Sequence, residues 1–135
     1  MSIDIYVPRD ATALSLGAEG VAKAIAAEAR TRNVDVRVIR NGSRGMFWLE
    51  PFVEVATPAG RVGYGPVTVR DVPGLFDANF HTGGKHALSH GLTEELQYLK
   101  SQQRLTFQRV GIIDPVSVAD YVAHGGYQGL RNALS

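Results

Sequence analysis

The chain has 135 residues, of which 44% are hydrophobic and 20% charged, a composition typical of one globular domain and not of a disordered chain. The formal net charge of +1 gives no reason to expect a nucleic acid or an anionic membrane as a partner. The sequence contains no cysteine, which excludes disulfides, cysteine nucleophiles and thiolate-ligated clusters within these residues. No secretory signal and no apolar run of the ~18 residues that a membrane helix needs are visible, so we expect a cytoplasmic location.

The first forty residues predict a strand, a helix and a second strand. Apolar and polar residues alternate over 3–7, as they do in a half-buried strand. From about Ala11 to about Arg30 apolar residues recur at helical spacing, with Gly17 and Gly20 as weak points near the start. Alternation returns over 34–38. Together these segments predict a parallel β-α-β unit with a right-handed crossover.

A hairpin and a short helix are predicted next. Residues 52–56 and 61–64 flank Thr57-Pro58-Ala59-Gly60, which predicts a four-residue turn in which Gly60 supplies a positive φ. A helix interrupted by proline and glycine is predicted over 71–80. The order βαβ–ββα is that of a thioredoxin-like core, so we predict an α/β fold of this kind over residues 1–80.

The rest of the chain is predicted to be helical after a linker. Residues 81–92 are rich in glycine and histidine and lack periodicity, which predicts a loop or linker. The segment 93–135 is predicted as an appended helical segment. Thr93 is expected to cap its first helix, Asp114-Pro115 to start a second and residues 127–134 to form a third.

Two groups of side chains are candidates for a ligand site. His81, His86 and His90 fall within one loop and could bind zinc or nickel, but their spacing fits no standard zinc pattern. Solvated loop histidines are the preferred interpretation. Arg40, Arg44 and Arg61 are expected to lie near one another, either as an anion site or, as we favour, as a solvated basic rim.

Ser43, in Gly-Ser-Arg-Gly, lacks the strand–turn–helix context of a nucleophile elbow and is interpreted as a polar loop residue.

One stretch resembles a known iron–sulfur site. The segment NGSRGMFWLEP at 41–51, followed by the hairpin and YGPV at 64–67, resembles thioredoxin-like ferredoxins and the related subunits of NADH-linked hydrogenases and formate dehydrogenases. In that family two cysteines four residues apart supply half the ligands of a two-iron cluster. Ser43 and Phe47 stand at the matching positions, and the other pair would fall near residues 8–10. A hydroxyl is a poor iron ligand and a phenyl ring is none, so the resemblance implies a degenerate cluster site.

A second stretch resembles the entry to a flavin domain. The segment RLTFQRVGIIDP at 104–115, continuing through GGY at 125–127 to LRNAL at 130–134, is similar to the start of the NADH- and FMN-binding domain in the flavin subunit of respiratory complex I and its relatives. Many relatives have a cysteine where Val110 stands. The amino-acid sequences of both stretches most resemble the β-subunit of NAD-linked formate dehydrogenases, and the resemblance covers nearly the whole chain.

The resemblance implies a role for the complete subunit that this chain does not fulfil alone. The subunit would pass electrons from formate through iron–sulfur clusters and FMN to NAD. Its phosphate-binding glycine-rich loop and the ligands of a four-iron cluster would follow the last residue, so we expect a fragment or a truncated gene product. Catalytic, cofactor-binding and metal-binding residues are therefore expected to be absent from the chain, so it is not expected to be an enzyme by itself.

Two functional hypotheses follow. The first is an N-terminal docking domain whose partners are the other subunits of a formate dehydrogenase complex. The alternative is a stand-alone thioredoxin-like interaction module without enzymatic activity. Under both, Phe47 is predicted to fill the space of the lost cluster, and Trp48 is left open as an interface residue.

Overall fold

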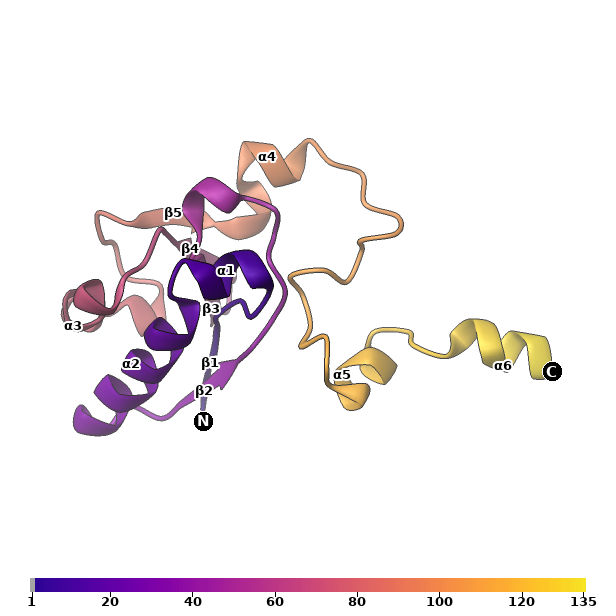
Figure 1. The fold of residues 1–135 in the computed structure, drawn as a ribbon, viewed down its shortest axis with the longest axis horizontal. Helices are drawn as coiled ribbons and strands as arrows, with labels where there is room; N and C mark the ends of the chain where they lie inside the picture. Colours follow the sequence, from indigo (N-terminus) through magenta and orange to yellow (C-terminus); the bar gives the residue numbers. More distant parts are fainter. Residues whose placement is uncertain (1) are drawn as a thin grey trace.

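The computed structural model describes residues 2–135, and it shows a mixed α/β core from which the C-terminal part extends (Figure 1). Its sheet has the order β2-β1-β3-β4-β5. β1 pairs with β2 in parallel and with β3 antiparallel, and β4 lies antiparallel between β3 and β5. The strands are β1 (Ile3–Tyr6), β2 (Val36–Ile39), β3 (Val53–Thr57), β4 (Gly60–Tyr64) and β5 (Ser89–Leu92).

The helices follow the predicted order. They are α1 (Ala11–Ser15), α2 (Ala18–Thr31), α3 (Val72–Asp77), α4 (Gln97–Lys100), α5 (Val118–Ala123) and α6 (Gln128–Leu134), with single 3₁₀ turns η1 (Phe47–Leu49), η2 (Val69–Asp71), η3 (Phe80–Thr82) and η4 (Thr93–Glu95). The βαβ–ββα order and the appended helical segment are thereby confirmed. The single helix predicted over 11–30 was wrong, because Gly17 takes a φ of 101° that ends one helix before the next begins.

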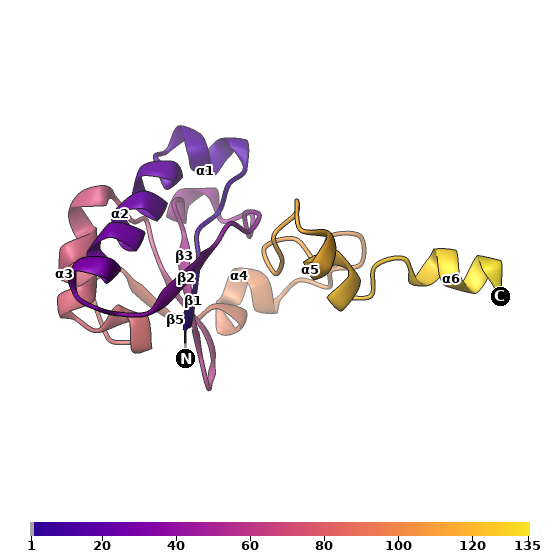
Figure 2. The ribbon, with the colours of Figure 1, turned by 90° about the horizontal axis from the view of Figure 1, so that it is seen from below.

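The main apolar core lies between one face of the sheet and the helices α2 and α3. Ile5, Val7, Val53 and Val55 point from the sheet into this core, where Ile25 of α2 meets them. Figure 2 shows α2 and α3 on one side of the sheet and α4 with the C-terminal segment on the other. The second face of the sheet is therefore covered by residues that come late in the sequence.

Two predictions around the hairpin need correction. The turn has two residues rather than four, because Thr57 and Gly60 still pair across it and the Thr57 hydroxyl donates to the Gly60 carbonyl at 2.7 Å. Gly60 does have the predicted positive φ, 127°. The loop predicted over 81–92 contains β5, which pairs with β4 across a register shift at Gly63 and Tyr64. That irregularity and the glycine within β5 hide the alternation that identifies a strand.

Two predicted helix starts also lie elsewhere. Thr93 is buried at the start of η4, and its hydroxyl has no hydrogen-bond partner among residues 2–135, so it caps no helix there. α5 begins three residues after Pro115, and Ser117 is its N-cap, accepting a hydrogen bond from the amide of Asp120. The Asp114 carboxylate instead accepts from the amide of Val116 in a tight turn. The Asp-Pro pair thus forms a turn before the helix.

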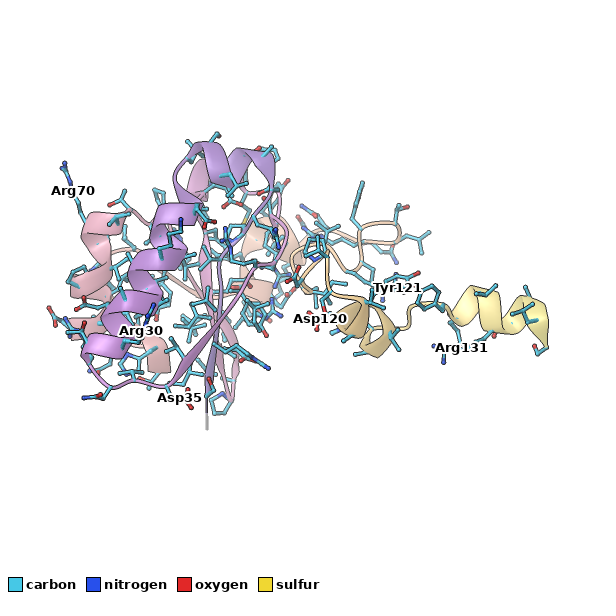
Figure 3. All side chains as sticks on the ribbon, turned by 60° about the horizontal axis from the view of Figure 1, so that its bottom comes forward. Arg30, Asp35, Arg70, Asp120, Tyr121 and Arg131 are labelled. Atoms are coloured by element: carbon cyan, nitrogen blue, oxygen red, sulfur yellow. The ribbon has the colours of Figure 1, made fainter. Side chains whose placement is uncertain are left out.

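The last two helices extend away from the sheet. Figure 3 shows Asp120 and Tyr121 on the segment that leads away from the core, and Arg131 on the final helix. Tyr121 and Tyr127 pack edge to face with ring centroids 5.0 Å apart, whereas Leu130 and Leu134 are 55% and 80% exposed. None of the helices in residues 2–135 has the length and apolar character needed to span a membrane.

We expect the amides of residues 121–134 to exchange hydrogen much faster than those of β2 and β3. Helices as short as α5 and α6 are marginal in water unless they pack against a surface, and the apolar side chains of α6 are exposed. Hydrogen exchange on the purified chain, with its mass measured in parallel, tests this. Equal protection of both regions in a monomer would contradict it.

Candidate functional site

The residues that the resemblance matches to cluster ligands of ferredoxins line one hollow. Ser43, Phe47 and Asp10 stand on the wall of an open pocket of about 570 Å³. Asp10 follows β1, in the loop where the second cysteine pair was placed. The opposite wall comes from residues 102–115, which connect α4 to α5 and which we call the strap; Phe107 and Val110 are part of it.

Ser43 is held by hydrogen bonds within the chain. Its hydroxyl donates to Glu50 Oε1 at 2.7 Å and accepts from the amide of Gly45 at 3.0 Å. The other oxygen of Glu50 accepts from the amide of Phe52 at 2.9 Å. These bonds fix the loop between β2 and β3, so the serine acts as a structural polar residue.

Phe47 does not fill the space of the lost cluster, and that prediction was wrong. Its side chain is 56% exposed. The 3₁₀ turn η1 is the reason, because Met46 just before the turn enters a second small core with Phe52 and Leu99 while the turn directs Phe47 outward. The space beside Ser43 is consequently an open hollow with Phe47 on its wall.

Trp48 is exposed beside the same hollow. It is 61% exposed and packs edge to face against Tyr98, with ring centroids 5.0 Å apart. Tyr98 itself lines the hollow. Trp48 and Tyr98 thus place aromatic rings next to the hollow that Ser43 and Phe47 line.

A buried ion pair lies behind the hollow. Glu54 sits between two core valines of β3, so its side chain points to the opposite face of the sheet. There it accepts two hydrogen bonds from Arg44, at 2.8 Å from Nη2 and 3.1 Å from Nε. The Arg44 and Glu54 side chains are only 3% and 1% exposed, and Glu94 approaches the third nitrogen of Arg44 at 2.9 Å. The pair therefore lies on the sheet's second face, over the middle strand β3.

The same polar cluster binds the strap to the sheet. Arg61 donates to the carbonyls of Gly111 at 2.9 Å and Ile112 at 2.7 Å, while its guanidinium lies 3.4 Å from the centre of the Tyr6 ring. Asn41 also donates to the Gly111 carbonyl, at 2.8 Å.

Arg104 of the strap completes the contact, because it donates to the Arg44 carbonyl at 2.9 Å. Guanidinium–carbonyl hydrogen bonds therefore hold residues 104–112 on the sheet.

The predicted arginine group is neither an anion site nor a solvated rim. Arg40 donates to Glu19 at 2.6 Å and to the carbonyls of Val7 and Pro8. Arg44 and Arg61 are engaged as described above. Arg44 and Arg61 do share one carboxylate, that of Glu54, whereas Arg40 pairs with Glu19 of α2. Glu54 and the strap carbonyls were missed by the sequence analysis. The one signal was a glutamate between two valines of a strand.

The three histidines have separate partners. His81 stacks on Phe76 with centroids 5.6 Å apart, and burial, with a smaller contribution from Arg32, lowers its pKa. His86 Nδ1 accepts from the amide of Leu88, and His90 Nε2 lies 2.8 Å from the Gly65 carbonyl. Within residues 2–135 no three histidine, aspartate or glutamate side chains are grouped so that they could hold a metal ion. The interpretation as solvated loop histidines was wrong for His81, whose Nδ1 is buried and has no hydrogen-bond partner in the described part of the chain.

We expect Glu50→Gln to change the pH dependence of stability. Burial raises the pKa of Glu50 above 4.5, although the bonds from Ser43 and from the Phe52 amide oppose the shift. An acid whose folded pKa is raised contributes stability below its unfolded pKa, and this contribution is lost as the pH rises through the folded pKa. The wild-type chain should lose stability relative to Glu50→Gln from about pH 4.5 upward. Urea unfolding from pH 4 to pH 8 measures the free energy of unfolding of both proteins. A difference between them that stays constant with pH would contradict a raised pKa of Glu50.

The purified chain is expected to stay colourless and iron-free after anaerobic iron–sulfur reconstitution. The sequence has no cysteine, and the hydroxyl of Ser43 is committed to Glu50. Metal and sulfide analysis with a visible spectrum checks this, and a cysteine-ligated ferredoxin reconstituted in parallel is the positive control. Stoichiometric iron and sulfide in the chain would contradict the expectation.

Comparison with known proteins identifies the fold. No protein-family model and no curated protein sequence matches the chain. Among solved structures, the wild-type thioredoxin-like [2Fe-2S] ferredoxin from Aquifex aeolicus superposes with a TM-score of 0.55 at 19% identity, covering 67% of this chain and 97% of that one. A cysteine-to-serine variant of that ferredoxin gives 0.55 at 20% identity, covering 66% and 98%. The chain therefore contains the thioredoxin-like fold of such ferredoxins.

Proposed function

We propose that the chain is a cluster-less thioredoxin-like docking domain of the β-subunit of a cytoplasmic NAD-linked formate dehydrogenase. Its role is structural: it joins the flavin domain of that subunit to the other subunits of the complex. FMN, NAD and the four-iron cluster belong to the remainder of the subunit, and electrons from formate do not pass through this domain.

The observation that carries this proposal is the polar network that attaches the strap beside Ser43, at the position matched to a cluster ligand. Where a ferredoxin of this fold needs thiolates, the chain has Ser43 bonded to Glu50 and, behind it, Arg44 bonded to Glu54. The strap that they position carries the segment resembling the entry to the flavin domain. A site of this kind can orient an attached domain but offers no ligand set for electron transfer.

The exposed face of the C-terminal helices supports the docking role. Leu130 and Leu134 recur at helical spacing on α6 and are largely exposed, and Tyr127 is 47% exposed beside them. An apolar helix face of this kind requires a covering surface in the assembled protein. Because residues 104–134 resemble the entry to the flavin domain, we propose that this domain packs against the exposed apolar face of α6.

The test uses the chain together with the flavin domain of a formate dehydrogenase β-subunit encoded in the same genome. Size-exclusion chromatography and calorimetry should show a stoichiometric complex, and Leu130→Glu should weaken it at least tenfold. Val69→Glu, at an exposed position of η2 on the α3 side of the sheet, is the matched control and should bind like the wild type.

Sequencing the coding region beyond Ser135 gives an independent result. A downstream glycine-rich loop and a four-cysteine motif support the proposal. A stop codon together with no complex would refute it and favour the stand-alone interaction module.

A further inference from the structure

The hollow that Ser43 and Phe47 line has the dimensions of a small-molecule site. Its volume of about 570 Å³ falls within the ~300–1,000 Å³ of typical ligand pockets. It lies between two segments about sixty residues apart in the sequence, the loop at 42–47 and the strap. The hydrogen bonds of the strap to the sheet hold both walls in place without a ligand. The pocket is thus formed in advance, and a ligand would not have to order it.

The lining of the pocket is suited to a flat aromatic ring. Phe47, Tyr98 and Phe107 contribute aromatic rings, and Val110 adds an aliphatic surface. Gly45 leaves the loop without a side chain, and its φ of 83° disfavours any other residue. A ring can therefore approach the backbone on one side and pack against aromatic side chains on the others.

Most polar groups of the wall are already committed to the chain itself, and one oxygen of the Asp10 carboxylate caps α1 by accepting from the amide of Ala13 at 3.4 Å. Ser43 is bonded to Glu50 and to the amide of Gly45. Arg44 is paired with Glu54 and Glu94. Arg104 uses its three nitrogens on Gln102, the Val110 carbonyl and the Arg44 carbonyl. An anionic ligand would have to break one of the arginine bonds to be neutralised, whereas an uncharged ligand leaves them all intact.

We propose that this pocket binds a small, uncharged aromatic molecule. The pocket thereby becomes a ligand site that is independent of the docking face on α6. Bound ligand would contact both the loop at 42–47 and the strap, so binding would stabilise the docked position of the strap.

The experiment is a titration of the full chain with the neutral fluorescent probe N-phenyl-1-naphthylamine. We expect saturable 1:1 binding with micromolar affinity. Val110→Trp places a large ring in the hollow and should weaken binding at least tenfold, as should Phe107→Ser, which removes one aromatic wall at an exposed position. Val69→Trp adds the same ring to the α3 side of the sheet and should bind like the wild type. Circular dichroism confirms that each variant is folded.

Amide shifts in an NMR titration with the same probe locate the site. Shifts centred on Gly42, Gly45 and Val110 are the expected result. Non-saturable binding, unchanged affinity in both pocket variants, or shifts centred on α5 and α6 would overturn the proposal. The last outcome would show apolar adsorption on the docking face. Because Leu130→Glu leaves the pocket intact, that variant should retain probe binding even if the docking proposal fails.

Discussion

Replacing Arg44 by methionine is expected to lower the free energy of unfolding by about 3–5 kcal/mol, because the change leaves a buried carboxylate without its partner. Methionine keeps much of the length and volume of the arginine stem, so the main loss is charge and hydrogen bonding. Glu54 would retain the Asn41 amide at 3.3 Å and Arg61 at 3.8 Å, contacts too long to replace two hydrogen bonds of 2.8 and 3.1 Å. Urea denaturation at neutral pH measures the loss.

Arg37→Met is the matched control for this change. Arg37 also makes a two-bonded contact with a carboxylate, Asp4 on the adjacent strand, at 2.8 Å for both bonds. Its side chain, however, is 67% exposed, so water replaces the lost partner and we expect a loss of about 0–1 kcal/mol. Equal losses in the two variants would show that burial does not determine the strength of the Arg44–Glu54 pair.

The double variant Arg44→Met/Glu54→Leu separates the pair from its surroundings. When both charges are replaced by apolar groups of similar volume, no buried charge is left unpaired, and much of the stability should return. The strap should nevertheless lose part of its attachment, because Glu54 also accepts from Asn41 at 3.3 Å and lies 3.8 Å from Arg61. These two side chains donate to the Gly111 carbonyl of the strap. Recovery of global stability without recovery of amide protection at residues 104–112 is the expected pattern.

The sequence predicts the βαβ unit and the hairpin well because their strands alternate and their turns carry glycine or proline. It does not reveal β5, since that four-residue strand contains a glycine and pairs across a register shift. It places Ser43 through resemblance to a ferredoxin loop, and the structure brings Ser43 and Asp10 to one hollow. The direction of Phe47 depends on η1, whose register is set by Met46 packing against Phe52 and Leu99. Such long-range packing leaves no periodic signal over three residues.

The Arg44–Glu54 ion pair is a second feature that could not be predicted from the sequence. Arg44 reads as a surface residue in a glycine-rich loop, and Glu54 violates the apolar pattern of its strand. The burial of each charged side chain is explained only by the other, which lies next to it in the fold, and by Arg61 and the Gly111 carbonyl nearby. A polar network assembled from residues 41–61 and 104–112 is a tertiary property. Rules that consider only neighbouring residues in the sequence treat each member of this network as an isolated exception.

Replacing Gly111 by alanine is expected to displace the strap and cost about 2–4 kcal/mol, from the sum of backbone strain and overpacking. Gly111 has a φ of 81°, and a Cβ added there would lie 2.3 Å from Arg44 Cδ and 2.9 Å from Arg44 Nε. Arg44 cannot move aside easily, because two bonds to Glu54 and one contact with Glu94 hold its guanidinium. The strap must therefore shift, which breaks the bonds from Arg61 and Asn41 to the Gly111 carbonyl.

The variant Gly91→Ala separates the cost of backbone strain from the cost of displacing the strap. Gly91 has a similar φ of 76°, but an added Cβ there meets no atom within 4 Å, so its cost should be about 1 kcal/mol from the backbone alone. Chemical denaturation gives the two costs, and hydrogen exchange shows where protection is lost. The contrary result is that Gly111→Ala costs no more free energy of unfolding than Gly91→Ala while residues 104–112 remain protected. That result would show that Arg44 does not hold the strap in place and that its ion pair stabilises only the sheet.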